Sequence, residues 1–120
     1  MIQMLDGLPD NVVGFRAVGK VSADDYEATI NPAIENASES GDGLRVLYLL
    51  GADFDGFEVE AGLDDMKMGM RHWSQFEKIA LVTDNGSYRT MTKAFGFLMH
   101  GEVKVFSVGA LDEARSWVAG

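Results

Sequence analysis

The segment LRVLYLL, Leu44 to Leu50, decides the fold of this 120-residue chain. It is a nearly continuous apolar run of residues that favour β-structure, which is typical of a strand covered on both faces. KIALV, Lys78 to Val82, has the same character, and EVKVFSV, Glu102 to Val108, is a third and less apolar run. The sequence therefore predicts three strands of one sheet that is covered on both sides.

Helical patterns alternate with these strands, at Val59 to about Trp73, Ser87 to about Met99 and Leu111 to Val118. Strands that alternate with helices pair in parallel through right-handed crossovers. At the N-terminus, the turn-forming segment DGLPDN joins a strand in residues 1–5 to one in 12–21, and strands joined so closely are antiparallel neighbours. We expect an α/β fold with a mixed five-stranded sheet, an N-terminal antiparallel hairpin and about four helices.

A further helix is predicted before the first buried strand. Ser22 and Asp25 have the spacing of a capping box, in which a hydroxyl and a carboxylate accept hydrogen bonds from free amides of the first turn. Pro32 falls inside the helical pattern, where it lacks an amide and its ring clashes with the preceding turn. We expect it to bend or split the helix near residues 28–31. The apolar stripe of this helix is Tyr26, Ile30, Ala33, Ile34 and Ala37.

The composition indicates one acidic domain, residues 1–120. Its 47% hydrophobic content suffices for one compact core. The absence of cysteine excludes disulfides, thiol nucleophiles and thiolate metal sites. Nineteen acidic against ten basic residues give a net charge of −9, which repels nucleic-acid phosphates, so no nucleic-acid partner is expected. MIQMLDGLPD lacks the order of a secretory signal and no window is apolar enough to span a bilayer, so we expect a cytoplasmic protein.

Several longer segments carry a family resemblance. They are VSADDYEATINPAIE (Val21 to Glu35), LRVLYLLGADFDGFE (Leu44 to Glu58), DDMKMGMRHWSQFEKIALVTD (Asp64 to Asp84) and VKVFSVGALDEARSWV (Val103 to Val118). In this order and spacing they resemble the SpoIIAA-like family, whose members are also called STAS/SEC14-domain proteins. The resemblance implies a βα superhelix. It also implies a kinship in shape with anti-sigma-factor antagonists and with Sec14-type lipid carriers.

The two related classes imply different functions. The antagonists switch by phosphorylation of a serine at the helix start that follows the third strand, yet this chain has no serine, threonine or tyrosine from Gly51 to Trp73. Acidic residues occupy this region instead, and acids are also what a helix N-terminus favours. The Sec14-type carriers hold an apolar ligand under a mobile helix. Because it has no hydroxyl residue in this region, the chain departs from the antagonists at the residue on which their switch depends.

The helix at Val59 to Trp73 contains three of the seven methionines. Helical periodicity predicts that Val59, Leu63, Met66, Met70 and Trp73 form one stripe, which we expect to face the sheet. Met68 is then predicted to point away from the core. Gly62 and Gly69 flank the stripe and weaken the helix, which favours a segment that can shift or open. Flexible thioethers suit a pocket that accepts ligands of varying shape.

We therefore expect a site for an apolar or lipid-like small molecule between the helices at 59–73 and 87–99. Its predicted lining is Met66, Met70, Trp73, Met91 and Phe95. Phe57 and Gly62 are predicted to form its mobile entrance, and Arg71 or Arg89 to bind a polar head group. Half of the basic residues lie in this stretch, which favours transient contact with anionic head groups of a membrane. They are Lys67, Arg71, Lys78, Arg89 and Lys93.

Other interpretations remain open. Each predicted site residue also has a packing explanation, and the acidic face or the FGFLMH segment could serve a homodimer or a regulatory protein partner. Asp53 and Asp84 follow predicted strand ends and could hold Mg²⁺, although DNGS, Asp84 to Ser87, is equally suited to cap a helix. No nucleophile elbow or nucleotide-binding motif is present. We expect no enzymatic activity, no catalytic residue, no metal and no cofactor.

Overall fold

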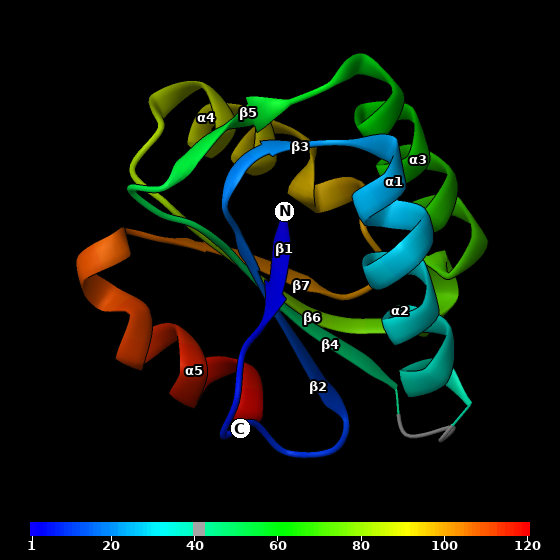
Figure 1. Ribbon diagram of the computed structural model, residues 1–120. Coiled ribbons are helices and arrows are strands. Elements are labelled where there is room, and N and C mark those ends of the chain that lie inside the picture. The colour runs from blue at the N-terminus through cyan, green and yellow to red at the C-terminus, as the bar shows by residue number, and fades with distance from the viewer. Residues whose placement is uncertain (40–42) are drawn as a thin grey trace.

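A five-stranded mixed sheet forms the centre of the molecule (Figure 1). It belongs to a computed structural model that describes residues 1–39 and 43–120, apart from the side chains of Phe95 and Phe97. β1 is antiparallel to β2, and the remaining neighbours are parallel. This confirms the predicted α/β fold with its N-terminal hairpin. The strands lie in the order β1 (Ile2–Met4), β2 (Val12–Ala17), β4 (Leu44–Leu50), β6 (Phe76–Thr83) and β7 (Glu102–Phe106).

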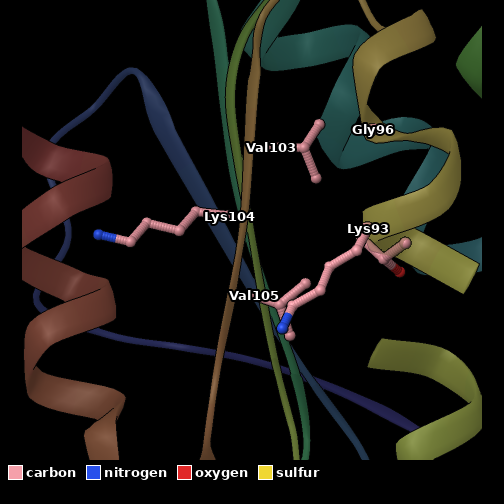
Figure 2. A pocket seen from close by; sticks show the side chains of 6 residues that line it. Lys93, Gly96, Val103, Lys104 and Val105 are labelled. Atoms are coloured by element: carbon pink, nitrogen blue, oxygen red, sulfur yellow. The ribbon is translucent and has the colours of Figure 1, made fainter. Parts of the chain in front are cut away.

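Helices cover both faces of this sheet. Figure 1 shows α5 on one side and α1, α2 and α3 on the other, and Figure 2 shows α4 opposite α5 across β7. α1 and α2 belong to one continuous helical stretch, so the described residues contain four helical units, as predicted. The helices are α1 (Ala23–Asp25), α2 (Asn31–Ser38), α3 (Val59–Arg71), α4 (Gly86–Phe95) and α5 (Leu111–Ala119).

The strand that decides the fold is buried on both faces. Leu44, Val46 and Leu50 of β4 belong to the core cluster beneath the larger group of helices. Leu47 and Leu49 belong to a second cluster, which α5 covers with Ala114 and Val118. Because successive side chains of a strand point to opposite faces, a strand between two cores has to be apolar at nearly every position.

The predicted second strand divides at Gly19. The sequence predicted one strand over residues 12–21, but β2 ends at Ala17 and β3 (Gly19–Val21) leaves the main sheet. β3 pairs in parallel with β5 (Phe54–Phe57) in a separate two-stranded sheet. Gly19 has φ +67°, which glycine adopts without steric cost, and its amide donates to the carbonyl oxygen of Asp53 at 2.6 Å. The prediction of a single strand is therefore wrong.

Pro32 is accommodated by a π-helical segment. The capping box is confirmed, because the amide of Asp25 donates to Ser22 Oγ at 3.2 Å and the amide of Ser22 donates to Asp25 Oδ2 at 2.9 Å. Residues Tyr26–Ile30 then form a π-helix, in which the Asn31 amide reaches back to the Tyr26 carbonyl. Pro32 lies in the first turn of α2, where its missing amide costs little. The disturbance expected near Pro32 is therefore present as one extra residue in the π-helical turn that precedes it.

The remaining helix boundaries agree closely with the sequence. The helix predicted at Ser87 to Met99 is α4, which is followed by a 3₁₀ turn at Gly96–Leu98. α5 matches the predicted helix at Leu111 to Val118 within one residue. Within the ranges that the structure describes, no helix has both the length and the apolar character needed to cross a bilayer.

Candidate functional site

α3 presents its longest apolar stripe to the outside of the molecule. The sequence predicted that this stripe would face the sheet, and that prediction is wrong. The exposed fractions of Val59, Leu63, Met66, Met70 and Trp73 are 78%, 52%, 61%, 74% and 46%. We call these residues the outer face of α3, although Trp73 itself lies in the 3₁₀ turn Trp73–Gln75 that follows the helix.

A second, shorter arc of α3 faces the protein body. Ala61 is fully buried, His72 is buried, and Met68 packs against the core cluster beneath the helix. The prediction that Met68 points away from the core is therefore also wrong. The small side chain of Ala61 lets the helix backbone approach the body closely. Periodicity alone does not distinguish this arc from the outer face, because both have helical spacing.

Ionisable groups lie on this inner side. Tyr26 Oη donates a hydrogen bond to Asp65 Oδ1 at 2.7 Å and lies 3.4 Å from Tyr48 Oη. Desolvation raises the pKa of Asp65, and burial raises the pKa of Tyr26 and of Tyr48. Sequence analysis missed this cluster. The available signal was the helical spacing of Ala61, Asp65, Met68 and His72, which places a carboxylate among residues that turn out to face inward.

Two further polar atoms on α3 and its C-terminal cap are buried without a partner. Asp64 Oδ2 and His72 Nε2 accept or donate no hydrogen bond among the described residues. The other ring nitrogen of His72, Nδ1, lies 2.7 Å from Gln75 Oε1. Removing polar atoms from water without a compensating hydrogen bond is unfavourable. The inner side of α3 is therefore held against the body at a free-energy cost.

The predicted entrance residues have different environments. Phe57 lies in β5 and is part of an aromatic cluster, with ring centroids 5.0 Å from Phe54, 5.7 Å from Tyr88 and 6.1 Å from Tyr48. Gly62 is exposed, with open space where a side chain would be. Phe57 is thus a packed residue, whereas Gly62 borders the outer face.

Both predicted head-group ligands already have protein partners. Arg71 Nη1 forms an exposed ion pair with Glu35 Oε1 at 2.9 Å. Arg89 Nη1 donates to the carbonyl oxygen of Thr83 at 2.8 Å, beyond the end of β6. Only the Arg71 pair is open to solvent, where ion pairs contribute little to stability.

The remaining predicted lining residues lie on other elements. Met91 of α4 and Leu98 of the following 3₁₀ turn are exposed. Trp73 Nε1 donates to the Leu98 carbonyl at 3.1 Å, which connects the end of α3 to that turn. The side chain of Phe95 lies outside the described part of the structure. Among the described residues, the predicted lining members Met66, Met70 and Trp73 therefore lie on an open surface.

Two hollows lie elsewhere on the molecule. One, of about 290 Å³, lies between α4 and β7, and Figure 2 shows Val103 and Val105 on the α4 side of β7 while Lys104 extends toward α5. The other, of about 460 Å³, includes Ser74 and His100 in its lining. Neither hollow includes a predicted ligand-binding residue.

Asp53 and Asp84, the two carboxylates considered as Mg²⁺ ligands, already have partners within the protein. Asp53 forms an ion pair with Arg16, and Asp84 Oδ1 accepts a hydrogen bond from the Val108 amide at 3.0 Å. The residue that caps α4 is Asn85, whose Oδ1 accepts from the Tyr88 amide at 3.1 Å. The capping interpretation of the DNGS segment accounts for this edge of the sheet.

The comparison with protein families decides the family. The model of the SpoIIAA-like family matches residues 12–119. This chain belongs to the SpoIIAA-like family. A solved SpoIIAA-like structure, an uncharacterised protein from Shewanella loihica PV-4, is 26% identical with a TM-score of 0.78, over 98% of this chain and 92% of that one.

A second solved structure has a similar fold. The anti-sigma factor antagonist SpoIIAA in its unphosphorylated form matches 96% of this chain and 98% of its own, with a TM-score of 0.56 and 14% identity. At that identity the likeness concerns the fold alone. A search of curated proteins finds no match.

This SpoIIAA-like chain lacks a hydroxyl at the start of α3. β4 ends at Leu50, and no serine, threonine or tyrosine occurs from Gly51 to Trp73. Glu58 occupies the N-cap position of α3, and its side chain makes no capping hydrogen bond. A phosphorylation switch at this helix start has no acceptor residue in this chain.

Proposed function

We propose that this protein is a non-enzymatic binder of apolar or lipid-like molecules, which it contacts through the outer face of α3. The observation that carries the proposal is the exposure of the longest apolar stripe of this helix. Val59, Leu63, Met66 and Met70 face solvent, while the Asp65 carboxylate accepts a hydrogen bond from the buried Tyr26 and His72 is buried. An ordinary surface helix has the opposite arrangement, because its apolar face supplies the burial that holds it in place.

The outer face of α3 contributes little to folding. Met66 and Met70 are 61% and 74% exposed and bury little surface in the folded monomer, so selection for stability alone does not account for methionine at these positions. Thioether side chains adapt to irregular partners, which makes them common on surfaces that bind varied apolar ligands. This supports a ligand that covers Met66 and Met70.

The attachment of α3 is weak enough for the helix to shift when a ligand arrives. Among the described residues of α3, only Ala61 is fully buried. Gly62 and Gly69 each lower helix stability by about 1 kcal/mol relative to alanine. Movement away from the body would also return the unpartnered polar atoms Asp64 Oδ2 and His72 Nε2 to water. A ligand can therefore bind on the outer face or enter beneath the helix at modest cost.

Arg71 is the proposed contact for an acidic head group. Its pair with Glu35 is exposed on both sides, so an anionic ligand can replace that carboxylate without the loss of a buried interaction. The same surface is suited to transient contact with an anionic membrane, since apolar residues and the exposed Lys67 lie on one helix.

Native mass spectrometry tests this proposal. The purified protein is expected to carry a lipid-sized adduct that organic solvent extracts, and to bind a dansyl-labelled fatty acid after extraction. Met66→Glu is expected to abolish both signals. Met4→Glu is the matched control, since Met4 is an exposed methionine of β1. An empty protein that also ignores the fatty acid, or a Met66→Glu variant that binds as well as the Met4→Glu variant, would contradict the proposal.

A regulatory protein-binding module is the second candidate. The structural likeness to an anti-sigma factor antagonist favours it, although this chain has no switch hydroxyl at the corresponding helix. In that case the purified protein would carry no lipid, and affinity capture would recover a protein whose binding Met66→Glu prevents.

A further inference from the structure

We propose that two copies of this chain pair through α3, with the two helices antiparallel and their outer faces in contact. This goes beyond the proposed function, because it concerns a second copy of the chain and requires no ligand. The arrangement of apolar, charged and glycine residues around α3 supports this pairing.

The outer face of α3 has the spacing of a coiled-coil seam. Its members, at positions 59, 63, 66, 70 and 73, recur at alternating intervals of four and three residues. This is the heptad spacing at which two helices pack side by side with interlocking side chains. An ordinary surface helix needs a broader apolar stripe with a period of 3.6 residues. The spacing therefore favours a helix as the partner of this surface.

The flanks of the seam are open and bear a distinctive pattern. Gly62 and Gly69 border one side, and apart from their chain neighbours and the backbone of the helix itself, no atom lies within 4 Å of the position that a Cβ would take at either glycine. Glu60 and Lys67 border the other side and are both exposed. Within residues 1–39 and 43–120, neither of them forms an ion pair. Each flank is thus available to a second helix.

The charges select the orientation of the pair. In a parallel pair, residues of one flank face residues of the opposite flank, so Lys67 would lie opposite Gly62 of the partner subunit. In an antiparallel pair, each flank faces its own equivalent. Glu60 then lies opposite Lys67 of the partner subunit, and the two-fold axis repeats this ion pair. Only the antiparallel arrangement matches both charges.

The same register also satisfies the apolar and glycine positions. Val59 faces Met70 of the partner subunit and Leu63 faces Met66 of the partner subunit. Gly62 lies opposite Gly69 of the partner subunit, which allows the two backbones to approach closely on that flank. A surface that complements itself in this way is the requirement for a symmetric homodimer.

The pair is expected to be reversible. α3 has 13 residues, which corresponds to a length of about 20 Å. A seam of this length is short for a standard interface of about 1,600 Å², and the net charge of −9 on each copy opposes association. An apolar ligand and a second copy of the chain would therefore compete for the outer face of α3.

Charge-exchange variants test the pairing on lipid-extracted protein by sedimentation velocity over a concentration series. The unaltered chain is expected to show a monomer–dimer equilibrium. Glu60→Lys or Lys67→Glu alone places like charges opposite each other twice, and should raise the dimer dissociation constant at least about tenfold. An equimolar mixture of the two variants restores opposite charges and should recover the dimer. Lys93→Glu, at an exposed lysine of α4, is the control and should leave the equilibrium unchanged.

Several results would overturn the pairing. These are a chain that stays monomeric at every concentration, single variants that associate as well as the unaltered chain, or a mixture that does not recover association. The pairing and the lipid-binding proposal can be tested separately, because Glu60→Lys leaves the outer face apolar. If both proposals hold, the Glu60→Lys variant loses the dimer and still binds the dansyl-labelled fatty acid, whereas the Met66→Glu variant loses both.

Discussion

Asp65 is the charged residue on which the attachment of α3 depends most directly. Its carboxylate accepts a hydrogen bond from Tyr26, a fully buried residue of the preceding helix. Desolvation raises the pKa of Asp65 above its ordinary value of 3.8, and the hydrogen bond from Tyr26 offsets only part of that effect. The hydrogen bond thus fixes α3 in one position, while the desolvation of the carboxylate makes that position less stable when Asp65 is ionised.

This balance predicts a pH-dependent effect of Asp65→Asn. A carboxyl whose pKa is higher in the folded protein favours folding when protonated, and that contribution is lost as the pH rises through the folded-state pKa. At neutral pH the ionised Asp65 therefore lowers the free energy of unfolding. Asparagine keeps an oxygen acceptor for Tyr26 without the charge. We expect Tm to rise by a few degrees at about pH 7 and the gain to vanish near about pH 4, as measured by circular dichroism.

Tyr26→Phe is the matched control for this effect. It removes the hydroxyl donor and leaves Asp65 Oδ1 without its partner, which should lower the free energy of unfolding by about 1–3 kcal/mol. The two variants thus change stability in opposite directions at neutral pH. If Asp65→Asn lowers Tm at both pH values, the charge of Asp65 is compensated in the folded protein and the inner side of α3 is not under electrostatic strain.

At the scale of the single element, α3 shows where sequence reasoning succeeds and where it stops. The helix was predicted almost within its observed bounds, because three-and-four spacing indicates a helix whichever way the helix faces. Its orientation was not predictable, because both arcs are partly apolar and the choice depends on what Ala61 and Met68 contact. The predicted placement of Met66 and Met70 toward the sheet was wrong for the same reason, whereas their role in binding a ligand stays a prediction.

Other elements depart from prediction for local reasons. The π-helical turn before Pro32 relieves the proline without ending the helix, and the pattern of apolar residues does not indicate how many residues a turn contains. β5 has four residues, among them the acidic Asp55 and the glycine Gly56, so it had no strand signal of its own. It forms because β3 supplies a pairing partner beside it.

The glycines of α3 give a prediction at the element scale. Gly62 has open space around its Cα, so Gly62→Ala introduces no clash and removes the conformational entropy that glycine loses in a helix. We expect the free energy of unfolding to rise by about 0.5–1 kcal/mol in urea titrations at low protein concentration. Gly101→Ala is the contrasting control. Its Cβ would overlap the carbonyl oxygens of Phe76 and Glu77, so it should destabilise the protein. An unchanged or lower stability for Gly62→Ala would show that Gly62 is held in a strained or crowded backbone.

At the scale of the whole molecule, the two sides of the sheet differ in how firmly their helices are held. α5 buries Ala114 and Val118 against β4 and β6 side chains, and Lys78 Nζ donates to the Trp117 carbonyl at 2.9 Å. α3 lies on the opposite side, farther from the sheet, with an apolar outer face and polar contacts beneath it. The parallel sheet and α5 thus form a stable framework, and α3 is the element that function can move.

This difference predicts the order in which the helices open. Hydrogen exchange followed by mass spectrometry should show that α3 amides exchange through local opening, while amides of β4 exchange only through global unfolding. The measurement uses the Glu60→Lys variant, so that a second copy does not protect α3. We expect peptides from α3 to exchange at least about a hundredfold faster than peptides from β4, since isolated helices of this length are marginal in water.

α5 is the internal reference for that experiment, because this 9-residue helix is shorter than α3 but buries Ala114 and Val118 in the core. Its amides should exchange at a rate between those of α3 and β4, and bound fatty acid should slow exchange in α3 more than in α5. If α3 exchanges as slowly as α5, the helix is as firmly attached as the framework, and a ligand cannot enter beneath it. Binding would then be confined to the outer face, where no movement of α3 is required.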